Sequence, residues 1–214
     1  MATQTVKYFE GNSKTLTKAL LNDLFKGVAH ISIMPFDAVK QSSGDNAGGI
    51  KWDGLNFAGA DEIYTIKDSF QVTQGDPSTE NIEVDQFDTA IDTTTTPGEW
   101  NFQGNIPSIA AELCNVFYKK GVVISGTDGI NGQGAGSAYA GQAYFAEPKE
   151  VIATMLVENR AASMAIAFAR VKITVGLSKD DASNPAYLKM AGTILANPEA
   201  SGLQGDWAVL KKKA

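Results

Sequence analysis

The sequence is poor in the residues on which most catalytic and metal sites depend. It contains one histidine, His30, and one cysteine, Cys114, among 214 residues. A single cysteine excludes an internal disulfide, which fits a reducing compartment or a protein that gains stability by assembling with other copies. The usual zinc site needs several such ligands, so none is expected. A nucleophilic Cys/His pair requires both side chains within hydrogen-bonding reach, and we expect packing roles for both instead.

Long apolar runs are also lacking. No segment approaches the roughly 18 apolar residues that a membrane-spanning helix needs. The opening stretch MATQTVKYFEGNSK does not have the pattern of a secretory signal. We therefore expect a protein that is soluble where it is made, without membrane insertion. With 43% hydrophobic and 20% charged residues, the chain is suited to one domain over residues 1–214 with a substantial core.

Basic residues are missing from one long stretch. Between Asp68 and Trp100 there is no lysine or arginine, and eight residues are acidic: Asp68, Asp76, Glu80, Glu83, Asp85, Asp88, Asp92 and Glu99. The chain has 24 acidic and 18 basic residues in all, so this stretch carries −8 and the remaining 16 acids and 18 bases carry +2, which together give the net charge of −6. Because duplex binding depends on Lys and Arg contacts to phosphate, an acidic protein of this kind is not expected to adhere to nucleic acid.

Many segments of the sequence have the pattern of β-strands. Alternating apolar and polar residues, β-branched residues and aromatics predict strands. The expected strands lie at 28–34, 50–57, 62–74, 81–87, 90–96, 100–105, 122–126, 142–147, 150–159, 163–177 and 207–213. A turn is expected at 75–78, and the pattern of 186–197 fits either helix or strand. The strands around the acidic stretch have one apolar face and one acidic or hydroxyl face.

Helical pattern is limited to two segments. Residues 107–121, PSIAAELCNVFYKKG, have apolar residues at helical spacing, with Pro107 at the start and Gly121 at the end. Residues 13–26 place Leu16, Leu20 and Leu24 on one side of a helix ended by Gly27, although TLTKALL also fits a strand. The sequence therefore predicts a mainly β fold, a sandwich or barrel with one flanking helix around 107–120 and long loops near 38–49 and 127–141.

Several chemical interpretations of the unusual segments can be weighed. Hard oxygen ligands for calcium are available at Asp76, Glu80, Glu83, Asp85 and Asp88, but without the spacing of a calcium-binding loop. Two carboxylates could hydrolyse a sugar, and a plain acidic, solvated sheet face is the alternative. The glycine-rich stretch NGQGAGSAYAG lacks the ending of a phosphate-binding loop. It is better explained as a loop that orders against a neighbouring subunit, or as a solvent loop.

The order of these segments resembles a known family. SFQVTQGDP, ENIEVDQFD, a threonine-rich strand and GEWNFQGNIPS leading into IAAELCNVFYKKG are similar to the tail tube (major tail) proteins of tailed bacteriophages, most clearly over Ile63–Gly121. The closing strands EVIATMLVEN and MAIAFARVKITV are similar in style to those of the family. The resemblance implies subunits that form stacked rings, six to a ring, whose strands join into a continuous inner barrel. The related type VI secretion tube uses a similar subunit.

The resemblance also implies a role and a location. The tube is the conduit for DNA ejection in the phage tail of the virion, and its partners are other copies of the subunit, tape measure, terminator and baseplate proteins. No catalytic residue, cofactor or metal is implied. The glycine-rich 127–141 loop, the 38–49 loop and the N-terminal segment would contact neighbouring subunits or rings. The alternative is a β-sandwich carbohydrate-binding or adhesion module that depends on calcium; a hydrolase with two carboxylates is a third.

A tube of this kind would explain why the acidic residues are concentrated in one stretch. A lumen lined with carboxylates repels DNA phosphates, so the genome passes without sticking. The lumen-facing candidates are Glu83 and Asp85, which share a strand phase, followed by Asp88 and Asp92. The set that faces inward depends on strand register, because a shift by one residue exchanges the two faces.

Overall fold

The fold is known from a computed structural model, which describes residues 27–82, 92–125, 129–131, 138–178, 186–199 and 201–212. The strands are β1 (Val28–Pro35), β2 (Asp61–Ile63), β3 (Gln71–Gln74), β4 (Ser78–Ile82), β5 (Asp92–Thr96), β6 (Trp100–Ile106), β7 (Tyr118–Ile124), β8 (Ile130–Asn131), β9 (Ala138–Tyr139), β10 (Gly141–Pro148), β11 (Val151–Asn159), β12 (Met164–Ser178), β13 (Tyr187–Leu195) and β14 (Trp207–Lys211). Two short helices are described, α2 (Phe36–Val39) and α3 (Ala111–Phe117). The expected mainly β fold with a flanking helix is confirmed.

One antiparallel sheet of eight strands forms the body of the protein. Its order is β2-β1-β11-β12-β13-β6-β3, with β14 paired to β12 in addition. The long strand β12 pairs with β11 along one side; on its other side, its first residues pair with β14 and the rest with β13. Strand β12 forms because its residues alternate: Val171, Ile173 and Val175 are buried, and the residues between them lie on the opposite face.

The sheet is rolled so that its two edges approach each other. Its edge strands, β2 and β3, are consecutive in the chain and are joined by residues 64–70. The Ile66 N–H donates to the carbonyl of Asn105 on β6 (2.7 Å), and the Asn105 N–H donates to Ser69 Oγ (3.1 Å). This linker therefore lies against β6, and it helps to hold the concave side of the sheet around a core.

The core fills that concave side and the region beneath α3. The fully buried large side chains include Phe117 from α3, Phe168 from β12, Met155 from β11 and Met190 from β13. Burying each such side chain contributes roughly 1.5–3 kcal/mol, so the helix is held by packing and needs little stability of its own. A second, smaller cluster of Phe36, Ile50 and Ala169 lies apart from it, where α2 and the segment that follows it pack.

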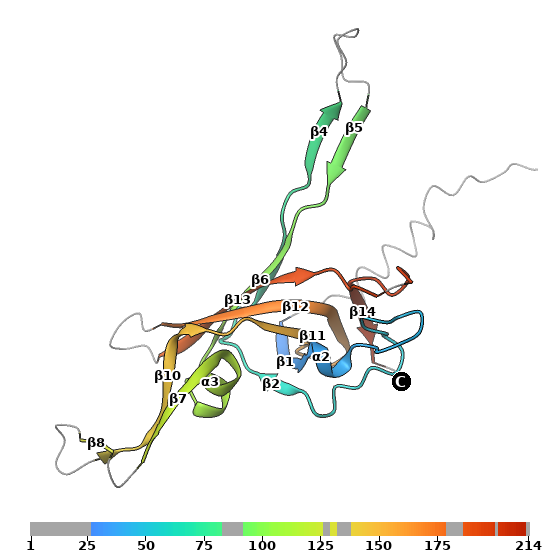
Figure 1. Ribbon diagram of the computed structural model, residues 1–214. Helices are drawn as coiled ribbons and strands as arrows, with labels where there is room; N and C mark the ends of the chain where they lie inside the picture. Colours follow the sequence, from blue (N-terminus) through green and yellow to red (C-terminus); the bar gives the residue numbers. More distant parts are fainter. Residues whose placement is uncertain are drawn as a thin grey trace, which may run out of the picture.

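Two β ribbons project from this body in different directions (Figure 1). One is the β4–β5 hairpin, and the other is the β7–β10 ribbon, which leads to the short β8–β9 pair. Neither ribbon pairs with the eight-stranded sheet among the strands described. Helix α3 comes directly before β7 and lies beside the base of the second ribbon.

The structure corrects several expectations about individual elements. No turn forms at 75–78, because the chain leaves β3 at Gln74 and enters β4 at Ser78 with only residues 75–77 between them. The helix expected over 107–121 is confined to α3, since the chain becomes strand β7 at Tyr118, in a segment whose Val122 and Val123 favour strand. Residues 50–57 form bends and turns, with no strand. The strand expected over 62–74 is interrupted between β2 and β3, where Asp68 has a positive φ of 62° that no strand residue adopts.

For other segments the structure confirms a strand, decides between two alternatives or changes the expectation of a plain loop. The ambiguous 186–197 segment is strand β13, and the threonine-rich segment forms β5. The glycine-rich region 127–141 contains β8 and β9, while its residues 127–128 and 132–137 lie outside the described residues, as does the 13–26 segment. In the described part of the chain, no helix has the length and apolar character needed to cross a membrane.

Candidate functional site

The β4–β5 hairpin is the part of the structure that carries the acidic stretch. Every described side chain of β5 is exposed, as are those of Ser78, Thr79 and Glu80 on β4. A two-stranded ribbon without a packed face is at best marginally stable in water. Among the described residues, these exposed side chains have no packed partner layer, so the hairpin is a candidate for contact with another chain.

The register of the hairpin assigns its acids to faces. Glu80 lies opposite Thr94, and Ile82 lies opposite Asp92. Because directly paired residues lie on the same face and alternate residues share a face, Glu80 and Asp92 belong to one side of the ribbon. The other side carries hydroxyl groups, with the Oγ1 atoms of Thr79 and Thr95 3.4 Å apart. The hairpin therefore has both of its described acids on one face, together with Ser78, Thr94 and Thr96, and we call this the acidic face. The other face carries hydroxyl groups and no described acid.

Of the four residues predicted to face a lumen, only Asp92 can be assigned to a face of the hairpin. Asp92 is exposed at the start of β5, where its carboxylate accepts a hydrogen bond from the Thr93 N–H (2.8 Å). Glu83, Asp85 and Asp88 lie outside the described residues. The residue that sequence reasoning missed as a lumen candidate is Glu80. Glu80 shares a face with Asp92 because of the hairpin register. This register cannot be derived from alternation within a single strand.

A close approach of two glycines fixes the base of the hairpin. The Gly75 N–H donates to the carbonyl of Glu99 (2.8 Å), and a Cβ on Gly98 would come within 2.0 Å of the Gly75 carbonyl oxygen. Only glycine fits at residue 98, because any side chain would collide with this backbone atom. Asp76 and Glu99 flank the contact, so the acidic character continues down to the base.

The β7–β10 ribbon presents apolar side chains to solvent. Val122 and Val123 are 72% and 75% exposed, and Phe145 is also exposed beneath the ammonium group of Lys119, which lies 5.1 Å from its ring centroid. Ile130 and Tyr139, on the β8–β9 pair, are exposed as well. The ribbon and the pair at its end therefore carry several exposed large apolar side chains, which are candidates for contact with another protein surface.

A small polar cluster lies at the edge formed by β1 and β2. Glu62 accepts hydrogen bonds from the hydroxyl of Tyr64 (2.5 Å) and from the His30 ring. The Tyr64 hydrogen bond is the main reason that the pKa of Glu62 lies below its ordinary value, and the same bond raises the pKa of Tyr64. His30, expected to pack in an apolar strand, is instead half-exposed and bound to this carboxylate.

Cys114 has a different environment from His30. It is buried on α3, where its thiol donates weakly to the Ile109 carbonyl (3.6 Å), and burial raises the pKa of the thiol. A raised thiol pKa disfavours the thiolate, which is the nucleophilic form. The packing role expected for Cys114 is confirmed.

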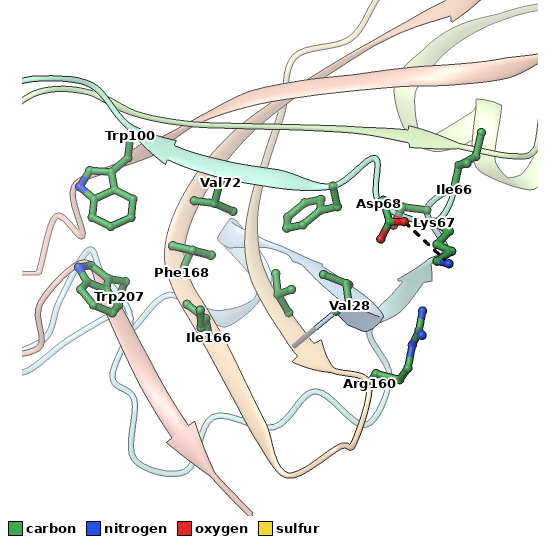
Figure 2. Close-up of a pocket in the computed structure, with 14 residues that line it drawn as sticks. Val28, Ile66, Lys67, Asp68, Val72, Trp100, Arg160, Ile166, Phe168 and Trp207 are labelled. Atoms are coloured by element: carbon green, nitrogen blue, oxygen red, sulfur yellow. Dashed lines mark ion pairs between the residues drawn. The ribbon is translucent and has the colours of Figure 1, made fainter. Parts of the chain in front are cut away.

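An apolar cleft opens where the rolled sheet is not filled by the core (Figure 2). Its volume is about 470 Å³, and its walls include Phe70, Val72, Trp100, Ile166, Phe168 and Trp207. The Trp100 and Trp207 rings lie at one end, and the charged side chains of Lys67, Asp68 and Arg160 lie at the other (Figure 2). No feature of the sequence alone indicated this cleft, because its walls come from strands far apart in the chain.

Within the described ranges, no three histidine, cysteine, aspartate or glutamate side chains are grouped as a metal site would require. Of the acids considered as calcium ligands, Asp76 and Glu80 are described and exposed, whereas Glu83, Asp85 and Asp88 are among the residues that the structure does not describe. A scan against protein-family models and a search of curated proteins found no match to this chain.

Proposed function

We propose that this protein is a phage tail tube subunit that polymerises as stacked rings and forms the conduit for DNA ejection. The observation that carries the proposal is the β4–β5 hairpin, an exposed ribbon with an acidic face that projects from a rolled antiparallel sheet. Such a ribbon gains stability when copies lie side by side. The rolled sheet with α3 at its flank also agrees with the architecture that the family resemblance implies.

The charge distribution supports the same proposal. Glu80 and Asp92 share the acidic face, and the whole segment from Asp68 to Trp100 contains no lysine or arginine. In a ring, several copies of this face surround one channel, so their potentials add in a confined space. The channel then repels phosphate along its length. DNA passes without specific binding, and the activity requires no catalytic group.

The exposed apolar ribbon β7–β10 is a candidate for the contacts between copies. Val122, Val123 and Phe145 are costly to leave in water, and contact with a neighbouring copy removes them from it. Association between different surfaces of identical subunits closes into rings when the rotation is correct, and otherwise continues into filaments. The subunit is made in the host cytoplasm and has its final place in the virion, with tape measure, terminator and baseplate proteins as partners at the tube and its ends.

Negative-stain electron microscopy of the concentrated protein tests the proposal. Hollow tubes or rings with a continuous channel are the expected result. Monomers that do not assemble over a range of salt and protein concentrations would overturn it. If those monomers melt at a higher temperature in calcium than in a chelator, the calcium-dependent binding module becomes the better interpretation.

A further inference from the structure

We propose that the apolar cleft between β3, β12 and β14 binds a single-chain amphipathic anion, an alkyl carboxylate whose head group pairs with Arg160. The volume of the cleft, about 470 Å³, is within the range of about 300–1,000 Å³ that holds small molecules. Predominantly apolar walls with a few polar groups that fix orientation are typical of such sites. This binding is a property of the single subunit and does not require a tube.

The floor of the cleft belongs to the hydrophobic core, whereas its walls stay partly open to water. Val157 and Phe168 line the cleft and are 2% and 1% exposed. Around them stand four half-buried apolar side chains: Phe70, Val72, Trp100 and Ile166. Trp207, at 45% exposed, is the most open of the apolar walls. An alkyl chain laid along these walls removes apolar surface of both molecules from water, which drives binding.

The two ends of the cleft differ in character (Figure 2). At one end lie the rings of Trp100 and Trp207, whose centroids are 5.7 Å apart. At the other end lie the charged side chains of Lys67, Asp68 and Arg160. A ligand that matches both ends is apolar over most of its length and polar at one end. A linear alkyl chain with one ionised head group has this form.

Arg160 determines the sign of the head group. The Lys67 ammonium lies 4.0 Å from the Asp68 carboxylate, so these two charges largely offset each other. Among the residues that the structure describes, Arg160 forms no ion pair. A guanidinium group donates two parallel hydrogen bonds to a carboxylate, and this geometry suits Arg better than Lys. The uncompensated charge at this end of the cleft therefore favours a carboxylate over a cation.

The turn between β11 and β12 holds Arg160 in place. Asn159 is 3% exposed, and its side-chain oxygen accepts hydrogen bonds from the N–H groups of Ser163 (2.9 Å) and Met164 (3.2 Å). The Arg160 side chain lies against Gly27 at the wall of the cleft, with its Nε 3.7 Å from where a Cβ on that glycine would be. A cation on a backbone fixed in this way needs less ordering when the ligand binds, which favours affinity.

Calorimetric titration of the full chain with decanoate, below the concentration at which micelles form, tests the proposal. Decyltrimethylammonium, which has the same chain and the opposite charge, is the ligand control, and it should bind more weakly than decanoate. We expect Arg160→Ala to weaken decanoate binding by about five- to tenfold, because it removes the charge-assisted hydrogen bonds to the head group. Lys120→Ala removes an exposed cation that does not line the cleft, and it should change the affinity by less than about twofold.

Photo-cross-linking gives the location of the ligand. A diazirine analogue of decanoate should label peptides that contain Ile166 or Trp207, and excess decanoate should prevent the labelling. Equal affinities for decanoate and decyltrimethylammonium, or an unchanged affinity in Arg160→Ala, would overturn the pairing with Arg160. Labelling confined to other surfaces would overturn the site.

The absence of saturable binding would also overturn the proposal, and it would favour a protein partner, such as a second copy of the chain, as the occupant of the cleft. The comparison of the two ligands uses the unsubstituted chain, so it remains decisive if Arg160→Ala does not fold. None of these results depends on whether tubes form.

Discussion

Trp100 on β6 and Trp207 on β14 face each other across the opening of the rolled sheet, with ring centroids 5.7 Å apart at an interplanar angle of 43°. These strands are not paired with each other; β6 pairs with β13 and β3, and β14 pairs with β12. The two rings therefore provide a side-chain contact between strands that no backbone ladder joins. They also form one end of the apolar cleft.

Removal of one ring should loosen this contact. We expect Trp207→Ala to lower the free energy of unfolding by about 1–2 kcal/mol, because an aromatic pair contributes about 0.5–1.5 kcal/mol beyond the area that it buries. Chemical denaturation monitored by circular dichroism measures the change. Leu203→Ala is the control, since Leu203 is 83% exposed, and it should change stability by less than about 0.5 kcal/mol. Equal effects of the two substitutions would contradict a role for the ring contact.

The acidic face of the hairpin can be tested by charge reversal. Glu80→Lys with Asp92→Lys should still permit tube assembly but make the channel attractive to phosphate. Purified tubes of this variant should bind short duplex DNA at low salt and release it as salt rises, whereas wild-type tubes should not bind. The control, Asp45→Lys with Asp53→Lys, changes the charge equally at exposed acids away from the hairpin. DNA binding by the control tubes alone would place the acidic face outside the channel.

A separate variant tests Glu83 and Asp85, the two residues first predicted from the sequence to face the lumen. Glu83→Lys with Asp85→Lys should hinder genome passage in the same way if these two residues face inward. Infection by phage that carries the substitutions measures this, with assembled tails as the check on folding. Unimpaired infection would show that the inward placement of these two residues is wrong, whatever the result for Glu80 and Asp92.

The glycine contact at the base of the hairpin should control assembly more than folding. Gly98→Ala places a Cβ against the Gly75 carbonyl at 2.0 Å, so the two strands must separate at the base of the hairpin. We expect a loss of tube formation with a change in melting temperature of only a few degrees, because residues 75 and 98 lie outside the strands β3 and β6 and neither belongs to the core cluster. Gly59→Ala is the matched control, since nothing lies within 4 Å of the added carbon. Normal tubes from Gly98→Ala would contradict the assembly role of the hairpin.

The Glu62–Tyr64 hydrogen bond should contribute an acid-dependent part of the stability. Because the pKa of Glu62 is lowered, its ionised form is favoured in the folded state, and the contribution is present above the ordinary pKa of 4.5. It is lost as pH falls through the lower, folded pKa. In Tyr64→Phe the pKa of Glu62 should rise toward its ordinary value, which an NMR titration of the carboxyl carbon would measure. An unchanged titration midpoint would mean that the hydroxyl is not the main cause of the shift.

Strands with marked alternation were predictable because the alternating apolar and polar residues that indicate a strand all lie within one short segment. The residues of β1, β11 and β12 alternate or form apolar runs, and these strands appear close to where they were expected. The helix over 107–121 was predicted too long, since helical spacing and strand propensity overlap at Tyr118. In the 50–57 segment, Ile50 and Trp52 pack at the second cluster without a strand, so apolar residues alone were misleading there.

The mainly β fold, the excess of negative charge in one stretch and the packing of the single cysteine could all be predicted before the fold was known. These features follow from composition and from short-range pattern, which a chain carries whether or not it is folded. In contrast, the shared face of Glu80 and Asp92, the contact between Trp100 and Trp207 and the apolar cleft beside Gly27 exist only in the folded chain. Each of these depends on the register and curvature of paired strands, which arise from contacts between residues distant in the chain.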